Sequence, residues 1–334
     1  MKNTKISRRS FLLGLAACSA AGVLTACKGT DAPSGSTASS AAEQPASSAA
    51  SSAVQQPEPF LTVEEFPPLD GSTACIPLMA QMLADTTGMD LEEARSSITV
   101  STTAYAWENF GLYDTTTRML VVYEAPDYVK EELQKANVQL EQKPIGVDAL
   151  VFIVNEDNPV QALTRQQLRD IYAGKITNWK DVGGKDQEIV AFQRGEDSGS
   201  QTLFKKLLIQ GRELMTPPSE LAPAAMGELV DSIADYNNSA NAIGFSVYYY
   251  IDQMYSKPGL RLLAVDGVTP SNDTLADGSY PLCNDFYAVI HPDAAADSPE
   301  RRLYDWLDTD AGQDCIKKSG YVAVGPQTTV TIVD

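Results

Sequence analysis

At residues 149–155 the sequence reads Ala-Leu-Val-Phe-Ile-Val-Asn, a run that is apolar up to its last residue. A strand with one solvated face would alternate apolar and polar residues, so this run predicts a strand that is buried on both faces. The following residues 164–172 have the periodicity of an amphipathic helix, and Thr164 is a residue type that caps helices. A buried strand followed by a helix is typical of an α/β domain.

Short β-rich segments and helical segments alternate on both sides of this run. The pattern predicts further strands at residues 98–101, 119–123, 188–192, 242–250 and 286–290. It predicts further helices at residues 76–83, 128–136, 201–210 and 301–318, of which the third ends at Gly211. Strands separated by helices in this order indicate an α/β fold with mainly parallel sheets flanked by helices.

The length and charge of the chain limit its function. Its 334 residues suffice for two lobes, and 43% of them are hydrophobic, which is enough for a buried core. The formal net charge is −19 at pH 7, and such a chain repels nucleic acid and anionic lipid head groups. We therefore expect no nucleic-acid partner. An anion bound by this chain would have to be held by local hydrogen-bond donors and helix N-termini.

The first residues have the pattern of an export signal. Basic residues precede an apolar stretch at 11–26 that is too short and too rich in Ala and Gly for a membrane span. The stretch ends in Leu-Thr-Ala-Cys at 24–27, which resembles the bacterial lipobox. We therefore expect residues 1–26 to be a lipoprotein signal peptide and Cys27 to carry the lipid. A weaker match ends at Cys18, but cleavage there would leave apolar residues at the mature end.

The mature chain would be even more acidic. Removal of residues 1–26 takes away four positive charges and no acids, which changes the formal net charge from −19 to −23. Arg8 and Arg9 fit a twin-arginine export signal as well as an ordinary Sec signal, and both interpretations stay open. Residues 27–59 consist almost entirely of Ser, Ala, Gln, Pro, Gly and Thr, a composition that predicts a disordered tether. A flexible coil of this length spans on the order of 30 Å.

The cysteines and the single histidine do not indicate a metal or catalytic centre. Beyond Cys18 and Cys27, the chain has Cys75, Cys283 and Cys315. A disulfide between Cys283 and Cys315 and three buried free thiols are both open interpretations. No Cys-x-x-Cys pair, zinc-type Cys/His spacing or Gly-x-Ser-x-Gly elbow is present, and His291 is the sole histidine. We expect no metal, no cofactor and no enzyme activity.

Two loops between predicted strands and helices carry the groups of a candidate anion site. The first reads Asp-Gly-Ser-Thr-Ala at residues 70–74, before the helix at 76–83. Ser72 or Thr73 would cap that helix, whose free N–H groups and positive dipole end would then face whatever lies beyond the loop. Taken alone, this loop has a commoner explanation as a plain helix cap.

The second loop reads Phe-Gln-Arg-Gly-Glu-Asp-Ser-Gly-Ser-Gln-Thr at residues 192–202. Ser198 and Gln201 have the spacing of a capping box. Gly199 permits close backbone approach, and Arg194 leaves the end of a strand and can reach the same place. Guanidinium, hydroxyl and helix N–H groups are the donors that a tetrahedral oxyanion requires, so this loop indicates an oxyanion site.

The sequence around these loops resembles a known family, the phosphate-binding proteins of bacterial phosphate ABC transporters. The resemblance covers about residues 67–326 and is densest at 148–158 (DALVFIVNEDN). It continues through 163–164, 171–179 (IYAGKITNW) and 182–184. Arg194 with Ser198, Gly199 and Ser200 fits the family's phosphate-clamping pattern. Residues 242–245 and 320–322 are further family marks.

The resemblance implies an α/β, two-lobed type II periplasmic-binding-protein fold, in which each lobe is a mainly parallel sheet flanked by helices. Two chain crossings would join the lobes, which close on the ligand like a jaw. Lobe one is expected at residues 60–147 plus 250–334, and lobe two at residues 148–249. The implied ligand residues are Ser72, Thr73, Thr102, Thr103, Glu124, Arg194, Ser198, Gly199 and Ser200.

The sequence departs from the family pattern at two places. The middle loop of lobe one is normally rich in Ser and Gly, whereas residues 101–105 read Ser-Thr-Thr-Ala-Tyr, without glycine. The family also places an Asp at the end of a lobe-one strand, where a carboxylate selects phosphate over sulfate by accepting the phosphate proton. Here Glu124 follows the strand at 119–123. Either Glu124, or Asp70, or no residue takes this role.

The resemblance implies capture of phosphate or a similar oxyanion outside the membrane and its delivery to an ABC transporter permease. The lipid on Cys27 would anchor the protein, which we expect to be a monomer, to the outer face of the cell membrane. The alternative ligands are molybdate, tungstate or an organic phosphate. The alternative function is that of a ligand-free surface interaction or signalling protein on the same fold.

Three consecutive tyrosines, Tyr248, Tyr249 and Tyr250, end the predicted strand at 242–250. We interpret them as half-buried packing at a lobe edge. The alternative interpretation places them at the edge of the cleft, where they would stack on an organic ligand.

Overall fold

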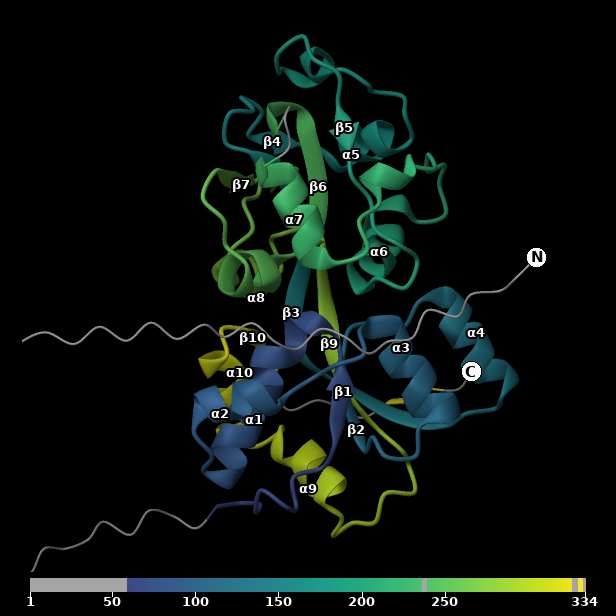
Figure 1. Ribbon diagram of the computed structural model, residues 1–334, viewed down its shortest axis with the longest axis vertical. Coiled ribbons are helices and arrows are strands. Elements are labelled where there is room, and N and C mark those ends of the chain that lie inside the picture. The colour runs from purple at the N-terminus through teal and green to yellow at the C-terminus, as the bar shows by residue number, and fades with distance from the viewer. Residues whose placement is uncertain (1–58, 236–238, 326–329, 333–334) are drawn as a thin grey trace, which may run out of the picture. The chain divides into compact units, whose positions relative to one another are not determined.

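The computed structural model describes residues 59–235, 239–325 and 330–332 (Figure 1). The predicted signal peptide, the lipid site at Cys27 and the tether up to residue 58 lie outside the described residues. The described part is built around one long strand, β3 (Leu140–Asn155). Residues 149–154 of this strand have no exposed surface, which confirms the prediction of a strand buried on both faces. β3 begins earlier than predicted because neighbouring strands, not an apolar pattern, hold its first half.

β3 lies in a nine-stranded sheet with the order β1-β2-β9-β3-β6-β5, to which β7, β10 and β11 add by pairing with β3. A separate two-stranded sheet contains β4 and β8. The first half of β3 pairs with β9, and Leu150 to Val154 pair with β6. β3 therefore passes from one part of the sheet into the other. The other strands are β1 (Leu69–Gly71), β2 (Met119–Val122), β4 (Ala162–Leu163), β5 (Val190–Ala191), β6 (Ala242–Val247), β7 (Leu260–Leu262), β8 (Ala264–Val265), β9 (Cys283–Ile290), β10 (Val322–Ala323) and β11 (Val330–Ile332).

Helices surround both parts of the sheet (Figure 1). In the view of Figure 1, β1, β2 and the first half of β3 form a lower part with α1 to α4, α9 and α10, and β4 to β7 with the second half of β3 form an upper part with α5 to α7. The helices are α1 (Ile76–Thr87), α2 (Leu91–Ser97), α3 (Thr103–Glu108), α4 (Asp127–Lys135), α5 (Arg165–Tyr172), α6 (Gly199–Leu203), α7 (Met226–Asp235), α8 (Asn272–Ala276), α9 (Pro299–Trp306) and α10 (Asp310–Lys318). Shorter 3₁₀ and π turns are η1 (Thr73–Cys75), η2 (Asn109–Tyr113), η3 (Trp179–Val182), η4 (Phe204–Ile209), η5 (Ser219–Leu221), η6 (Ser239–Asn241) and η7 (Tyr250–Met254).

The α/β class is confirmed, but the strand directions are more mixed than the expected mainly parallel sheets. The pairs β1–β2, β4–β8 and β5–β6 are parallel. β3, in contrast, is antiparallel to β6, β7, β9, β10 and β11. β3 and β9 run through the middle of the sheet in opposite directions, and antiparallel neighbours of this kind need no crossover helix between them.

Several predicted elements are confirmed, among them α1, α4 and α5. Thr164 caps α5 in a capping box with Gln167. Three segments differ from the prediction. Residues 98–101 form no strand, because the Ser101 N–H donates to the Asp70 carboxylate at 2.7 Å instead of to a neighbouring strand. β6 ends at Val247 and η7 follows, and residues 301–318 form two helices because Thr309 caps a new one.

The predicted lobe boundary at residue 249 does not match the strand pairing. β7 pairs with Ile153 to Asn155 of β3, and β8 pairs with β4. Residues 260–265 therefore lie with the upper part, although the sequence assigned them to lobe one. The chain returns through β9, which pairs with the first half of β3. The division of the chain into two lobes stays a prediction. The strand pairing places the second crossing between them at β9 rather than at residue 249.

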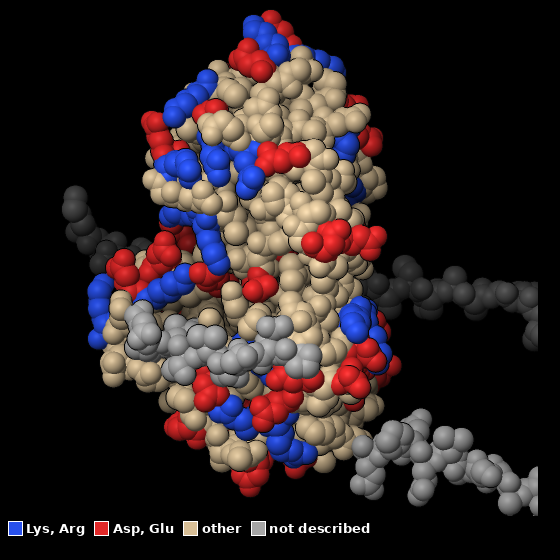
Figure 2. Space-filling view, turned by 180° about the vertical axis from the view of Figure 1, so that it is seen from behind, with Lys and Arg blue, Asp and Glu red and all other residues tan. Residues whose placement is uncertain are grey.

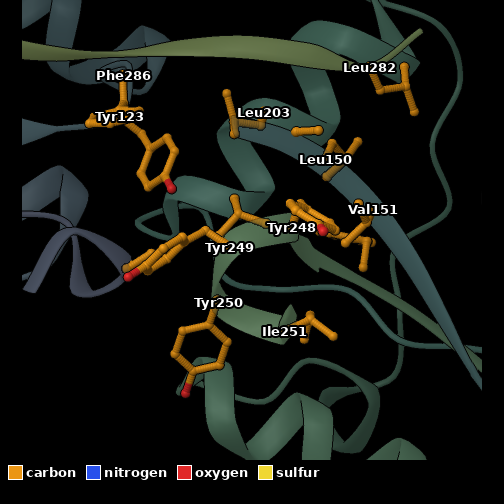
Figure 3. Packing of buried hydrophobic residues seen from close by; sticks show 14 of the residues in the cluster. Tyr123, Leu150, Val151, Leu203, Tyr248, Tyr249, Tyr250, Ile251, Leu282 and Phe286 are labelled. Carbon is orange, nitrogen blue, oxygen red and sulfur yellow. The ribbon is translucent and has the colours of Figure 1, made fainter. Parts of the chain in front are cut away.

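The three tyrosines after β6 pack inside the protein. Tyr248, Tyr249 and Tyr250 belong to a buried cluster that also contains Leu150 and Leu203 (Figure 3). Tyr249 stacks on Tyr321 with ring centroids 3.7 Å apart, and its O–H donates to the Ser319 carbonyl. This cluster joins the end of β6 to the lower part of the structure.

Acidic and basic side chains are interspersed on the face shown in Figure 2. Most ion pairs are surface pairs of single Lys or Arg residues with Asp or Glu. No helix among residues 59–235 and 239–325 is both long and apolar enough to span a bilayer.

Candidate anion-binding site

A cavity of about 590 Å³ lies between the loops that follow β1, β5 and η5. It brings together all the predicted ligand residues except Glu124. Whether these residues hold a ligand stays a prediction. The lining residues are Ser72, Thr73, Ala74, Thr102, Thr103, Tyr105 and Tyr123 from the lower part and Arg194, Gly195, Asp197, Ser198, Gly199, Ser200, Ala222, Ala224, Ala225, Met226, Gly227, Val247 and Tyr250 from the upper part or the segments next to it.

Three helical runs begin at this cavity. The run formed by η1 and α1 begins at Thr73, α3 begins at Thr103, and the run formed by α6 and η4 begins at Gly199. The N–H groups of these three residues have no acceptor among the residues that the structure describes. The first N–H groups of a helix have no partner in the helix itself, so they are available to an anion, which the helix dipole also favours.

The expected side-chain caps are absent from these helices. Ser72 Oγ accepts the Tyr123 N–H at 3.0 Å and lies 2.8 Å from Thr103 Oγ1, so it does not cap η1 or α1. The predicted capping box of Ser198 and Gln201 is not formed either. Gln201 is buried, and its Oε1 accepts the Arg194 N–H at 3.1 Å, which removes it from the helix terminus. Ser198 Oγ lies 3.0 Å from Ser200 Oγ at the cavity wall.

Arg194 is a buried cation without an ion-pair partner among the residues that the structure describes. Its side chain is 9% exposed, its Nε donates to the Pro223 carbonyl at 3.0 Å, and its Nη2 donates to the Ala224 carbonyl at 2.6 Å. Nη1 is buried and has no hydrogen-bond partner in the described part of the chain. Burial lowers the pKa of the guanidinium to about 10, so the group stays charged at neutral pH. A buried, unpaired positive charge is unfavourable alone, and an anion in the cavity would compensate it.

The two sides of the cavity touch at Gly199 and Thr103. A Cβ added at Gly199 would lie 2.4 Å from Thr103 Oγ1 and 3.2 Å from Thr103 Cβ. Glycine at this position therefore permits a backbone approach that no other residue allows. A second contact joins Tyr105 and Asp197, whose O–H and carboxylate oxygen are 3.4 Å apart.

The loop that lacks glycine keeps a backbone shape that favours glycine. Thr102 has φ 91° and ψ 168°. This region is strained for residues with a side chain, and such strain costs on the order of 1–3 kcal/mol. Its carbonyl accepts the Ala106 N–H at 2.8 Å at the start of α3. The strained backbone at Thr102 lies at the start of α3, which lines the cavity.

A family model described as a PBP superfamily domain matches residues 114–309, more than half of the chain. The chain belongs to the PBP superfamily. Members with curated names are similar to it over long stretches. The phosphate-binding protein PstS of Bacillus subtilis is 28% identical over 181 residues, which is 54% of this chain but only 56% of that protein. The PstS of Borreliella burgdorferi is 23% identical over 272 residues, or 78% of this chain and 91% of that protein.

Solved structures of this superfamily have the same fold. A Clostridium perfringens protein assigned to phosphate ABC transport, crystallised with bound phosphate, has a TM-score of 0.58 and 24% identity over 77% of this chain and 99% of its own. An ABC-type phosphate transport receptor from Vibrio cholerae has a TM-score of 0.56 and 22% identity over the same shares. These likenesses confirm the fold expected from the sequence, and the named relatives confirm the resemblance to phosphate-binding proteins.

Neither carboxylate considered for the phosphate proton lines the cavity of this PBP-superfamily chain. Glu124 forms ion pairs with Lys130 and Lys206, which lower its pKa against the effect of burial. The Asp70 carboxylate accepts the N–H groups of Gly71 and Ser101, each at 2.7 Å, and so holds two loops together. The cavity's one acidic residue among those described is Asp197, whose side chain is exposed.

A buried carboxylate lies behind the cavity, at the point where β3 passes between the two parts. Asp148 accepts the Tyr123 O–H at 2.5 Å and the N–H groups of Ala149 and Tyr249 at 2.7 Å and 3.1 Å. Burial raises its pKa to about 6, although these hydrogen bonds act in the opposite direction. Asp148 thus connects a cavity-lining side chain, Tyr123, to the backbone of the crossing strand.

Some lining residues of this PBP-superfamily site were not expected from the sequence. Tyr123 was counted only as part of a strand, yet it reaches the cavity. Tyr250, for which packing was the preferred interpretation, also lines the cavity, as the alternative interpretation had placed it. The apolar segment at residues 222–227 carried no motif. Its position beside Arg194 comes from the carbonyls of Pro223 and Ala224, and backbone acceptors leave no signal in a sequence.

The three cysteines that the structure describes do not form a disulfide. Cys75 and Cys315 are buried free thiols, and Cys283 is a part-buried free thiol. Burial raises the pKa of Cys283 to about 11, which keeps the thiol protonated and unreactive. Among the described residues, no group of three or more His, Cys, Asp and Glu side chains could hold a metal ion.

Proposed function

We propose that this protein captures phosphate, or a similar oxyanion, outside the cytoplasm and delivers it to an ABC transporter. Its role is binding, and no bond is made or broken. The single observation that carries the proposal is Arg194, a buried guanidinium whose Nη1 is unpaired in a cavity where helices begin. A charged donor next to helix N–H groups suits a tetrahedral oxyanion.

The named relatives support phosphate as the ligand. Two of them, from Bacillus subtilis and Borreliella burgdorferi, are called phosphate-binding proteins, and a structural neighbour from Clostridium perfringens holds bound phosphate. The same neighbour and the Vibrio cholerae receptor are assigned to ABC transport, which supports a transporter permease as the partner.

Ligand residues come from both sides of the cavity in this proposal. The lower part supplies Ser72, Thr73, Thr102 and Thr103, and the upper part supplies Arg194, Ser198, Gly199 and Ser200. Glu124 is not assigned a ligand contact, because its carboxylate is taken by two lysines outside the cavity. The export signal and the lipid on Cys27 complete the proposal, since a tether of residues 27–59 would keep the binding part near the membrane.

Thermal unfolding of the purified chain tests the proposal. Phosphate at a hundred times its dissociation constant should raise the unfolding free energy by about 2.7 kcal/mol, and sulfate and molybdate serve as comparison anions. At the same phosphate concentration, a loss of at least about 30-fold in the Arg194→Met variant should reduce this gain to about 0.9 kcal/mol or less. Absence of a shift with phosphate in the wild type, or an equal shift in Arg194→Met, would contradict the proposal.

A further inference from the structure

The cavity is larger than an inorganic oxyanion needs. Its volume of about 590 Å³ equals the share of about twenty water molecules in the liquid. Phosphate has only five heavy atoms, whereas cavities of 300–1,000 Å³ are typical of sites for small organic molecules.

The cavity also has two chemically different walls. The donors described above gather on one wall, around Arg194 and the helix starts at Thr103 and Gly199. The other wall is formed by Ala222, Ala224, Ala225, Met226 and Gly227 with Val247 and the ring of Tyr250.

The apolar wall is held in place next to the donor wall. The carbonyls of Pro223 and Ala224 accept both hydrogen bonds of the Arg194 guanidinium, so the segment that carries the apolar side chains also orients the cation. Tyr250 stacks on Tyr255 with ring centroids 5.7 Å apart, which fixes its ring at this wall. A group bound to Arg194 Nη1 would therefore have the apolar wall beside it.

The protonation state of the ligand also favours an organic phosphate over inorganic phosphate. A phosphate monoester has a second pKa of about 6, so at neutral pH its phosphoryl oxygens are mostly unprotonated acceptors. Inorganic phosphate near neutral pH still keeps a proton, which a carboxylate in the site would accept. Neither Glu124 nor Asp70 reaches the cavity, and the carboxylate that lines it, Asp197, is exposed.

We infer that the site binds phosphate monoesters with a short, mainly apolar carbon substituent more tightly than it binds inorganic phosphate. The phosphoryl group lies at Arg194 and the helix starts, and the substituent lies against residues 222–227. This inference rests on the proposed function, because it assigns the same donors to the phosphoryl group.

Calorimetric titration of the full chain with inorganic phosphate, n-butyl phosphate and n-butanol tests the inference. We expect n-butyl phosphate to bind about tenfold more tightly than phosphate, which corresponds to about 1.4 kcal/mol, and n-butanol not to bind. Ala225→Phe fills the apolar side of the cavity from an exposed position, so it should weaken n-butyl phosphate binding more than phosphate binding and remove the advantage of the butyl group.

Two further variants keep the test decisive. Ala136→Phe adds the same ring at an exposed position outside the cavity and should change neither affinity. Met226→Gln keeps the length of the side chain but makes the apolar wall polar, so it should reduce the advantage of the butyl group. This variant replaces Ala225→Phe in the test if Ala225→Phe folds poorly.

The outcomes separate the inference from the proposed function. Phosphate binding as tightly as n-butyl phosphate, or equal losses for both ligands in Ala225→Phe, overturns the inference and leaves phosphate capture standing. Absence of binding by both phosphoryl ligands overturns the inference and the proposed function together. Tight n-butyl phosphate binding that is lost in Ala225→Phe supports the inference.

Discussion

A methyl group added at Gly199 should impair closure of the binding site without unfolding the protein. The new Cβ of Gly199→Ala would lie 2.4 Å from Thr103 Oγ1, against ordinary contacts of 3.4–4 Å, so the two sides must move apart by about 1 Å. Overpacking of this kind costs typically about 1–3 kcal/mol. If the cost falls on the closed, ligand-bound state, phosphate affinity drops by about 5- to 150-fold.

A double-mutant cycle with Thr103 isolates this contact. In a Thr103→Ala background the nearest remaining atom is the Cβ at 3.2 Å, so the additional cost of Gly199→Ala should be much smaller. Gly195→Ala is the matched control, because it adds a methyl group to the same cavity but meets only the Asp197 carboxylate, at 3.3 Å. The assay is calorimetric titration with phosphate, together with the melting temperature of the ligand-free chain. Phosphate affinity of Gly199→Ala within twofold of the wild type, or an unchanged loss in the Thr103→Ala background, would refute the reasoning.

Three other predictions concern strain, charge and the contact between the two sides. Thr102→Gly should raise the unfolding free energy by about 1 kcal/mol in urea denaturation, because glycine tolerates the φ of 91°. A lower unfolding free energy in the variant would show that the backbone of Thr102 is not strained. Burial raises the pKa of Asp148 to about 6, so its carboxyl stabilises the fold at low pH and this contribution is lost as the pH rises through about 6. The unfolding free energy of the wild type relative to Asp148→Asn should therefore fall between pH 4 and pH 7 by up to about 3 kcal/mol. A difference that rises over this range would disprove the raised pKa of Asp148. Lys206→Met removes a lysine that pairs with Glu124 and donates to Asn284 at 3.0 Å, and it should weaken phosphate binding by at most about fivefold at low salt and not at all at 1 M salt.

The strand and helix pattern could be predicted where local sequence determines it. The run at 149–154 is apolar throughout, and Thr164 caps α5 with the box that its spacing predicts. The first half of β3 could not be predicted in this way, because residues 140–148 mix charged and apolar residues and are strand only through their pairing with β9. The segment at 98–101 failed for the opposite reason, since its β-branched residues have no neighbouring strand to pair with.

The candidate site was predictable as a set of donors but not as an arrangement. Arg194 and the Ser-Gly-Ser triplet at 198–200 stand in one loop, so their spacing alone brought them together. Glu124 was expected at the cavity because it follows the strand that leads there, but Lys130 and Lys206 draw its carboxylate to the outside. The apolar wall at 222–227 depends on backbone carbonyls that any residue possesses, so no side-chain pattern could reveal it.

The most direct test of phosphate capture compares the wild type and Arg194→Met in calorimetric titrations with inorganic phosphate under one buffer condition. The account predicts saturable binding by the wild type and a loss of at least about 30-fold in the variant, because the ligand then loses its charged hydrogen-bond donor in a buried site. Gln201→Ala, which removes only the side chain that accepts the Arg194 N–H, is the control and should cause a smaller loss. Phosphate binding by Arg194→Met within threefold of the wild type would contradict the central claim.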